Sequence, residues 1–483
     1  MDLPLLSTAF LQVGVQESRV QSSGIRKLLI LNKIAFPNGP WPSADFGRLI
    51  APELPRIALD CCLYRCTAEA PIKLKPTVLI ATTRRWFSTA RLSMALAETG
   101  YTVKAICPDD HPLHKTSAVE ESYPYRGLTP LASFVDAITM AKPDFIIPGD
   151  DLAAQHLRQL HHREQSSVGN KDICALIERS IGPAESFPFL FCRSKFINLA
   201  EEQGIRVPKT KAIANMHELR EWMASTSFPM VLKADGTSGG EGVRVVRTPQ
   251  EAERAFHRLQ APPIVARVVK RVLLDRDATL VWPMLSRRRS VVNAQAFVAG
   301  REATSLVACW KGTVLAALHF EVLNKQDANG PASVVRLIED PDIVSAAEKM
   351  VRRLNLSGLH GFDFMLEAQT GNAYLIEVNP RPTQVGHLKL GPGRDLPAAL
   401  RGAISGGRVL ESTKITDNDT IAFFPQEWQR NPESIFLRSA YHDVPWQEPE
   451  LLRACVRKQR RWSAWFSQRK GSQVFLEARL PRS

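Results

Sequence analysis

Four polar side chains near residue 370 are spaced in a way that suits metal and phosphate chemistry. Asp363 lies in one short apolar run, and in the next run Glu377, Asn379 and Arg381 follow one another at every second position. Because side chains alternate between the two faces of a strand, these last three should point the same way. Carboxylate and amide oxygens are ligands for a hard divalent cation such as Mg²⁺, and arginine offers phosphate oxygens a fixed positive charge.

A glycine-rich stretch, KADGTSGGEGV, lies upstream and fits two kinds of chemistry. Part of it matches the G-x-S-x-G pattern of hydrolases, in which the serine lies at a sharp turn between a strand and a helix. The following run, VRVVRT, predicts a strand, so a serine hydrolase that uses Ser238 is the less favoured alternative. Between two strands, such a loop instead leaves backbone N–H groups free to bind phosphate oxygens. The loop comprises Gly236, Thr237, Ser238, Gly239 and Gly240.

Two lysines stand near this loop. Lys233 precedes it on the predicted strand, and Lys195 lies at the start of the preceding helical region. Both side chains offer compact positive charges to a bound polyphosphate. Each feature alone also fits an ordinary structure, namely a hairpin without a ligand, a solvated lysine or a strand face with a salt bridge. Their combination favours a site that binds a polyphosphate together with a divalent cation.

Hydrophobic periodicity predicts the elements that position these residues. A βαβ unit runs from KPTVLIATTRRWF to the strand TVKAIC, and a later strand, PDFIIPGDD, is followed by another helix. This pattern predicts a parallel α/β domain over residues 76–190. From residue 191 strands and helices mix in an α+β order, which ends with a hairpin whose turn spans Gln369 to Asn372. Residues 1–75 lack periodicity and are predicted to form an irregular extension.

Length and composition set the class of protein. The chain has 483 residues, 44% of them hydrophobic and 23% charged, which predicts two to four globular domains. Its eight cysteines include no CxxC pair, and most lie in apolar runs, which indicates reduced thiols in a cytoplasmic protein. Asp2 and Pro4 stand where an export signal would carry basic charge, and no long apolar run follows. Neither export nor a membrane span is expected.

The formal net charge of +13 is compatible with nucleic acid, a membrane surface or an anionic substrate. Two stretches are strongly basic: PPIVARVVKRVLLDRDATLVWPMLSRRRS, which is predicted to be mostly helical, and the C-terminal RKQRRWSAWFSQRKG. The cations and aromatic residues of the second stretch fit a nucleic-acid-binding tail. They also fit an amphipathic helix that packs its aromatic side inward. We prefer the packed helix because the tail has no recognised nucleic-acid module.

The stretch from Arg193 to Leu390 resembles the ATP-grasp superfamily, and in particular its carboxylate-amine ligases. The most specific part is FDFMLEAQTGNAYLIEVNPRP, in which an acidic strand is followed by E-x-N-x-R. The α/β region before it resembles the domain that usually precedes this fold. The resemblance implies a Rossmann-like pre-ATP-grasp domain over 76–190, a two-lobed ATP-grasp domain over 191–404 and a small basic appendage over 405–483.

The resemblance also implies roles for individual residues. Asp363, Glu377 and Asn379 would hold Mg²⁺ or Mn²⁺, and Arg381 would be catalytic by stabilising the transferred phosphoryl group. Gln295 departs from the acid often found at the start of the adenine-binding hinge, although the backbone contact is unaffected. The residues implied to bind ATP through its phosphates, adenine or ribose are Lys195, Lys233, Gly236, Thr237, Ser238, Gly239, Gly240, Gln295, Ala296, Phe297, Val298 and Glu302.

The activity that the resemblance implies is an ADP-forming ligase. Such an enzyme activates a carboxylate as an acyl phosphate, which an amine or a similar nucleophile then attacks. The expected partners are small-molecule carboxylate and amine substrates, with a homodimer left open and nucleic acid not expected. An ATP-binding protein with a nucleic-acid-binding tail is the main alternative. Arg336 is a weak candidate for holding the substrate carboxylate, since a lone arginine after a strand is more often a surface residue.

Overall fold

The computed structural model describes seven parts of the chain, all within one compact unit, Pro71–Ser483. They are residues 75–165, 170–235, 242–261, 268, 290–327, 330–407 and 413–456. Several sequence predictions therefore lie outside the described residues. These are the N-terminal extension up to residue 74, the glycine-rich loop over 236–241, almost all of the basic stretch over 262–289 and the basic tail from residue 457.

The parallel sheet predicted for the first part of the chain is present and has four strands. Its strand order is β3-β2-β1-β4, so the order reverses beside β1. Apolar side chains fill both faces of β1 and β4, because helices cover the sheet. The strands are β1 (Thr77–Ala81), β2 (Thr102–Cys107), β3 (Glu121–Pro124) and β4 (Phe145–Pro148), and the helices are α3 (Phe87–Glu98), α4 (Pro130–Ala141), α5 (Asp151–Gln165) and α6 (Lys171–Ile181).

The carboxyl ends of β1 and β4 meet at one edge of this sheet. The strands pair in parallel, from Val78 opposite Phe145 to Ala81 opposite Pro148. The chain then turns into α3 after β1 and into α5 after β4. In open α/β sheets, ligands bind outside the strand ends where the strand order reverses. A ligand is therefore expected to bind just outside the carboxyl ends of β1 and β4.

A second sheet follows, here called the small sheet, with four antiparallel strands in the order β5-β8-β6-β7. Its side chains share a hydrophobic core with two helices, in which Leu219, Trp222 and Phe256 are buried. Strands β6 and β7 pair in antiparallel fashion and lie on either side of the glycine-rich loop in the chain, which confirms the two predicted strands. The elements are β5 (Thr210–Ile213), α9 (Met216–Ser225), β6 (Met230–Ala234), β7 (Val243–Val246), α10 (Pro249–Gln260) and β8 (Val292–Ala296).

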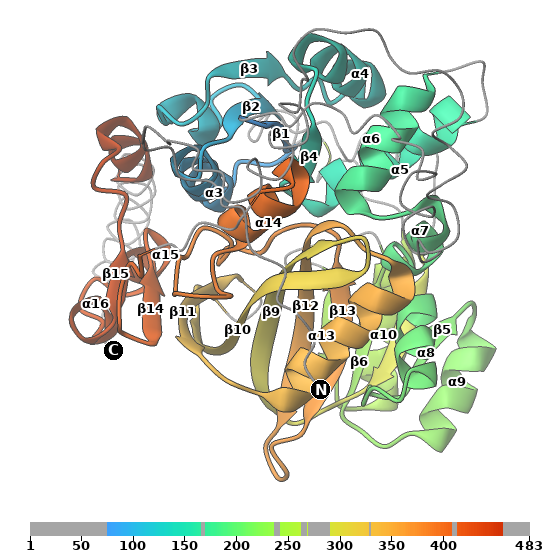
Figure 1. Ribbon diagram of the computed structural model, residues 1–483. Helices are drawn as coiled ribbons and strands as arrows, with labels where there is room; N and C mark the ends of the chain where they lie inside the picture. Colours follow the sequence, from blue (N-terminus) through green and yellow to red (C-terminus); the bar gives the residue numbers. More distant parts are fainter. Residues whose placement is uncertain are drawn as a thin grey trace, which may run out of the picture. The chain divides into compact units, whose positions relative to one another are not determined.

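The third sheet has seven strands in the order β13-β12-β9-β10-β11-β14-β15. Helix α13 (Pro341–Leu354) contacts β9, β10 and β13 and buries one apolar stripe, from Ile343 to Leu354 (Figure 1). The predicted hairpin is confirmed as β12 and β13, joined by a turn that contains Gly371. The strands are β9 (Gly300–Trp310), β10 (Thr313–Lys325), β11 (Ala332–Leu337), β12 (Gly358–Glu367), β13 (Ala373–Asn379), β14 (Thr420–Phe423) and β15 (Tyr441–Asp443).

The parallel sheet and the seven-stranded sheet share their hydrophobic cores. One core includes Leu157 from α5, Ile177 from α6, Met350 from α13 and Phe362 from β12. Past residue 405 the described chain adds two strands to the large sheet, because β14 pairs with β11 and β15 with β14. The domain boundaries at residues 190 and 404 remain sequence predictions. Short elements complete the described fold: α7 (Phe187–Leu190), α8 (Arg193–Glu202), α14 (Leu396–Ser405), α15 (Gln426–Arg430), α16 (Phe436–Ser439) and the 3₁₀ turns Pro112–Lys115 and Ala184–Ser186.

None of the helices in the described parts of the chain is long and apolar enough to span a membrane.

Candidate active site

A cavity of about 520 Å³ is lined by strands of the two other sheets and by a loop and helix α5 of the parallel domain. Cavities of several hundred cubic ångströms with a few converging polar groups are the usual place for small-molecule binding. The parallel domain contributes Asp151, the small sheet contributes Lys233, and the large sheet contributes Asp363 and Glu377. The hairpin residues that the sequence singled out therefore line the same cavity as residues of the parallel domain and of the small sheet.

The hairpin places its two acids side by side. Asp363 on β12 lies directly opposite Glu377 on β13, and Gly361 lies opposite Asn379. Residues opposite each other in an antiparallel pair have neighbouring side chains. The register shifts after Asp363, so that Ile376 has no partner of its own. The predicted alternation of Glu377 and Asn379 along one strand is present.

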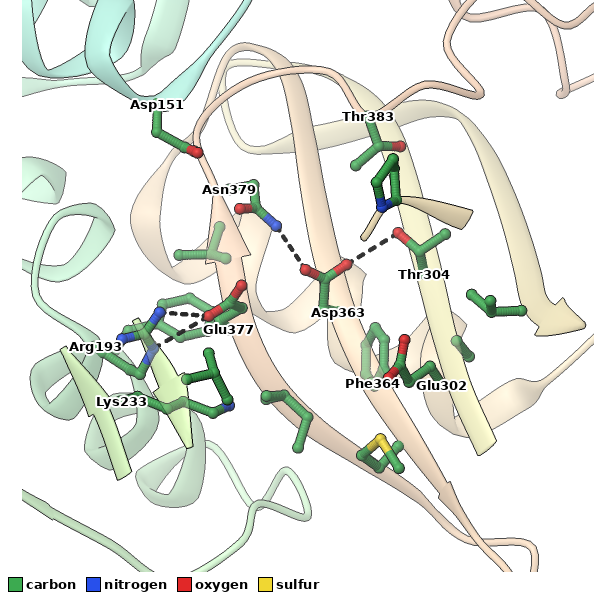
Figure 2. Close-up of a pocket in the computed structure, with 18 of the residues that line it drawn as sticks. Asp151, Arg193, Lys233, Glu302, Thr304, Asp363, Phe364, Glu377, Asn379 and Thr383 are labelled. Carbon is green, nitrogen blue, oxygen red and sulfur yellow. Dashed lines mark hydrogen bonds and ion pairs between the residues drawn. The ribbon is translucent and has the colours of Figure 1, made fainter. Parts of the chain in front are cut away.

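The Asp363 carboxylate is held on both oxygens. Asn379 donates to one oxygen through its amide nitrogen at 2.8 Å, and Thr304 donates to the other through its hydroxyl at 3.1 Å. Figure 2 shows both contacts. Burial, and then the charge of Glu377, raises the pKa of Asp363 above its usual range. The amide oxygen of Asn379 is left facing Arg381, whose Nη2 lies 3.4 Å away.

Glu377 forms an ion pair with Arg193, for which the sequence predicted no role. Arg193, the first residue of α8, donates to the same Glu377 oxygen from Nε at 3.1 Å and from Nη2 at 2.6 Å (Figure 2). Burial alone would raise the pKa of Glu377, but Arg193 and then Lys233 outweigh it and lower this pKa. Two neighbouring carboxylates are thus driven toward different protonation states by their surroundings.

Arg193 also reaches the small sheet. Its Nη1 lies 3.2 Å from Asp235, just past the end of β6, and the same oxygen of Asp235 accepts from Asn293 on β8 at 2.8 Å. Lys233 lies on β6 and is 7% exposed. Burial lowers the pKa of Lys233 to about 8, against the opposing attraction of Glu377. Two positively charged side chains, Arg193 from α8 and Lys233 from β6, therefore lie close to the acidic residues of the hairpin.

The predicted hinge lines another side of the cavity. Gln295, Ala296, Phe297 and Val298 all face it, as do the apolar side chains of Val231, Val243 and Val245. Gln295 is buried and donates to the hydroxyl of Thr210 at 3.0 Å. Glu302 also lines the cavity, and Lys325 donates to it at 2.7 Å. An apolar slot between these side chains, next to backbone polar groups, suits the ring system of a nucleobase.

Residues 192–388 match the family model described as the carbamoyl-phosphate synthase L chain, ATP binding domain. These residues form an ATP-grasp domain. The fold of this chain is also similar to that of an N5-carboxyaminoimidazole ribonucleotide synthetase solved in complex with ADP. That likeness has a TM-score of 0.50 at 16% sequence identity and covers 71% of this chain and 81% of that chain.

Two further solved structures are similar to this chain. The biotin carboxylase domain of Hydrogenobacter thermophilus 2-oxoglutarate carboxylase, solved with MgADP, ADP and bicarbonate, has a TM-score of 0.49 at 17% identity, covering 71% of this chain and 72% of that chain. An L-amino acid ligase from Bacillus licheniformis has a TM-score of 0.46 at 15% identity, covering 68% of this chain and 75% of that chain.

The hairpin of the ATP-grasp domain offers a donor set that fits Mg²⁺. Asp363, Glu377 and Asn379 present carboxylate and amide oxygens, the ligands that this ion prefers. Burial and the neighbouring charge of Glu377 raise the pKa of Asp363, so a cation beside the two carboxylates would favour their ionised forms. Within the described ranges, no three His, Cys, Asp or Glu side chains gather into a complete metal site.

Not every predicted residue takes the expected position. Lys195 is exposed on α8 and does not line the cavity, whereas Arg193, two residues earlier, does. The contact of Lys195 with the ATP phosphates stays a prediction from the sequence. Arg336 pairs with the buried Glu321 of β10, so it has a structural partner within the large sheet. Gly236, Thr237, Ser238, Gly239 and Gly240 lie outside the described residues.

Arg381 faces the cavity from just beyond β13, but it is not alone there. Its Nε and Nη2 donate to the two carboxylate oxygens of Asp151 at 2.7 and 3.1 Å. Asp151 is the first residue of α5, in the parallel domain. The sequence signal that could have found it is GDD, two acids immediately after a buried strand. Nothing in the spacing of the chain indicates that Arg381 and Asp151 meet.

Proposed function

We propose that this protein is an ATP- and Mg²⁺-dependent ligase that activates a carboxylate as an acyl phosphate for attack by an amine or a similar nucleophile. The observation that carries the proposal is the meeting of Asp363 and Glu377 with Arg193 and Lys233 at one cavity of an ATP-grasp domain. Acids that suit a divalent cation and bases that suit phosphates are both needed where a phosphoryl group is transferred.

ATP would lie along the cavity with its base in the apolar slot. Val231, Val243 and Phe297 flank that slot, and the backbone of residues 295–298 offers hydrogen bonds to adenine. Glu302 would accept hydrogen bonds from the ribose hydroxyls. Lys233 and Arg193 would contact the phosphates, and the loop over 236–240 would close over them as the resemblance implies. Lys195 remains a further candidate from the sequence.

Asp363, Glu377 and Asn379 would hold the metal ion. When bound, Mg²⁺ or Mn²⁺ neutralises part of the phosphate charge. Arg193 now occupies one oxygen of Glu377, so the other oxygen is the one that this contact leaves for a ligand. Asn379 holds Asp363 by its amide nitrogen and keeps its own oxygen directed away from that contact.

The proposed reaction has two steps. First, a carboxylate oxygen of the substrate forms a bond to the γ-phosphorus of ATP, and the bond from that phosphorus to the ADP oxygen breaks. Second, the amine nitrogen bonds to the carbonyl carbon of the acyl phosphate, phosphate leaves with the electrons of the C–O bond, and the nitrogen loses a proton to water. Arg381 would stabilise the charge on the transferred group, and the cavity contributes chiefly by positioning.

The test is ADP formation with a panel of amino acids, dipeptides and small acids, in the presence of hydroxylamine as the nucleophile. An acyl phosphate reacts with hydroxylamine to give a hydroxamate, so the natural amine need not be known. We expect ADP and hydroxamate to form together with at least one carboxylate, and only with Mg²⁺ or Mn²⁺. ADP formation that no carboxylate stimulates would contradict the proposal. A homodimer and a cytoplasmic location remain predictions from the sequence.

A further inference from the structure

The cavity extends past the predicted phosphate site toward the parallel domain. There it is lined by Asp151 and Gln155, which lie one turn apart on the same face of α5, and by Arg381. Asp151 and Arg381 both remain partly exposed, at 26% and 15% of their side chains. A carboxylate and a guanidinium are therefore presented together to whatever occupies this end of the cavity (Figure 2 shows Asp151 above Asn379).

The pair has hydrogen-bonding capacity beyond its own contact. Each oxygen of a carboxylate can accept two hydrogen bonds, and each Asp151 oxygen receives one from Arg381. A guanidinium has five N–H donors. Those of Arg381 reach Asp151, the amide oxygen of Asn379 at 3.4 Å and the backbone oxygen of Pro382 at 3.3 Å. Both groups can therefore receive a ligand without first separating.

The position of Asp151 is fixed by its neighbour rather than by the cavity. Asp150 is buried and accepts from the backbone N–H groups of Thr83, Arg84 and Ala153. Gly149 has no room for a side chain, because a Cβ there would lie 2.8 Å from Thr89. This tight turn joins the loop after β1 to the start of α5. Asp151 is consequently held in place even when no ligand contacts it.

Aromatic side chains flank the same end. Trp86 lies in the loop that Asp150 holds, Phe189 lies in α7, and Phe191 follows that helix; all three line the cavity and are only half-buried. Phe191 lies beside α5, because the guanidinium of Arg158 is 5.2 Å from its ring centroid. Partly exposed aromatic rings around a charged pair form a pocket for a ligand with a polar head and an apolar body.

We propose that the substrate carboxylate belongs to an α-amino acid with an apolar or aromatic side chain, whose ammonium group is bound by Asp151 and whose carboxylate faces Arg381. The inference rests on the proposed function. An α-amino acid carries its ammonium and carboxylate on one carbon, and the Asp151–Arg381 pair presents the complementary charges 2.7 to 3.1 Å apart. The side chain would extend toward Trp86, Phe189 and Phe191.

Other carboxylates fit this arrangement less well. A dicarboxylate would bring its second negative charge toward Asp151, and like charges in such a cavity repel. A simple carboxylic acid would find Arg381 but would leave the spare oxygen lone pairs of Asp151 without a donor from the ligand. Binding to Asp151 also keeps the α-nitrogen protonated, so the activated amino acid would be attacked by the amine of a second molecule.

The test compares each apolar L-amino acid with its des-amino acid, for example phenylalanine with 3-phenylpropanoate, in the hydroxylamine assay with saturating ATP and Mg²⁺. We expect kcat/KM to be at least tenfold higher for the amino acid. In Asp151→Asn this preference should fall toward one, and in Asp151→Glu, which keeps the charge, a preference should persist. Asp172→Asn makes the same change at an exposed first turn, that of α6, and should leave the preference as it is.

The possible results separate the two proposals. If des-amino acids or dicarboxylates give hydroxamate as efficiently as amino acids, the inference is wrong and the ligase function stands. If Asp151→Asn lowers kcat/KM equally for both members of a pair, Asp151 only positions Arg381 and the inference is also wrong. If no carboxylate gives ADP and hydroxamate, the proposed function fails and the inference fails with it. ATP affinity measured by calorimetry shows whether each variant keeps its nucleotide site.

Discussion

Two clusters of charged side chains in this molecule both pair an acid with an arginine and yet differ in kind. In the cavity, Glu377 accepts from Arg193 and lies opposite Asp363. On β15, the edge strand of the large sheet, Asp443 accepts from Arg91 of α3 and from His387, whose Nε2 lies 2.7 Å away. Asp443 is 1% exposed and has a partner on each oxygen. The first cluster lines a cavity, whereas the second is sealed.

Comparing the two clusters shows which pairs of charged side chains mark a functional site. Burial would raise the pKa of Asp443, but His387 and then Arg91 outweigh it and hold this pKa well below its usual range. In the cavity Glu377 behaves similarly, while the pKa of Asp363 is raised. An arginine beside an acid is therefore not informative by itself. Two neighbouring acids with opposite shifts, at a cavity that a ligand can enter, mark the functional cluster.

The substitution Glu377→Gln should distinguish the cavity cluster from the sealed cluster most clearly, because it should abolish turnover without unfolding the protein. We expect ATP turnover to fall by about a thousandfold, because an amide cannot replace the charge that would hold the metal ion between the phosphates. The fold should persist, since Arg193 keeps Asp235 as a partner. The measurement is ADP formation with an active carboxylate, alongside thermal unfolding of the same sample.

The matched control for this change is Glu348→Gln on α13, where the side chain is exposed. It removes one negative charge and should leave turnover unchanged. Near-normal metal-dependent turnover in folded Glu377→Gln would remove the basis for assigning the metal to the hairpin.

The opposite result is expected for Asp443→Asn. Removing one partner of a buried ion pair leaves Arg91 without its counter-charge and costs about 3 to 5 kcal/mol of unfolding free energy. Urea titration of the two proteins measures this difference. The turnover of each folded molecule should be close to that of the parent, and a large loss of turnover without loss of stability would break the comparison.

The stability difference between parent and Asp443→Asn should also depend on pH. A carboxylate whose pKa is lowered by folding stabilises the protein above its unfolded pKa of about 3.9 and loses that effect as the pH falls. The difference should therefore be constant above about pH 5 and should narrow below about pH 4. A difference that grows in acid would show that another group is responsible.

The substitution Arg381→Ala tests whether this arginine acts on ATP binding or on phosphoryl transfer. An arginine that acts mainly on the transferring group should lower turnover by about a hundredfold when removed. ATP binding should change by only a few fold, about 1 kcal/mol or less. Calorimetry and substrate-dependent ADP formation measure the two effects. Parallel losses of both would identify Arg381 as a group that binds the ground-state phosphates.

Lys233→Met should affect nucleotide binding rather than the chemical step. Loss of one charge-assisted contact to the phosphates should weaken nucleotide binding by about 1.5 to 3 kcal/mol. Methionine keeps most of the apolar volume in a position that is nearly buried. Calorimetry with ATP and Mg²⁺ makes the measurement, and unchanged affinity would exclude Lys233 from the phosphate site.

The sequence predicted the parts of the site that are local in the chain. Period-two alternation predicted the β12–β13 hairpin, so the neighbourhood of Glu377 and Asn379 followed from strand geometry. The βαβ unit and the strands on either side of the glycine-rich loop were likewise visible in apolar periodicity.

Contacts between distant segments were not predictable in the same way. Arg193 and Lys195 lie two apart at the start of one helix, and only packing of α8 against β13 decides which of them faces Glu377. The meeting of Asp151 with Arg381 depends on how the parallel sheet packs against the large sheet. No periodicity in either segment contains that information. The sealed cluster of Arg91, His387 and Asp443 draws on three distant segments and is unpredictable for the same reason.

The central claim, that ATP activates a carboxylate as an acyl phosphate, is tested most directly by oxygen transfer. A carboxylate that is active in the hydroxylamine assay is labelled with ¹⁸O in both oxygens and incubated with ATP, Mg²⁺, hydroxylamine and the protein. Attack of the carboxylate on the γ-phosphorus leaves one substrate oxygen in the phosphate that is released. Mass spectrometry should therefore find one ¹⁸O atom in each inorganic phosphate and one in each hydroxamate. Unlabelled phosphate, with both ¹⁸O atoms still in the substrate, would contradict the account.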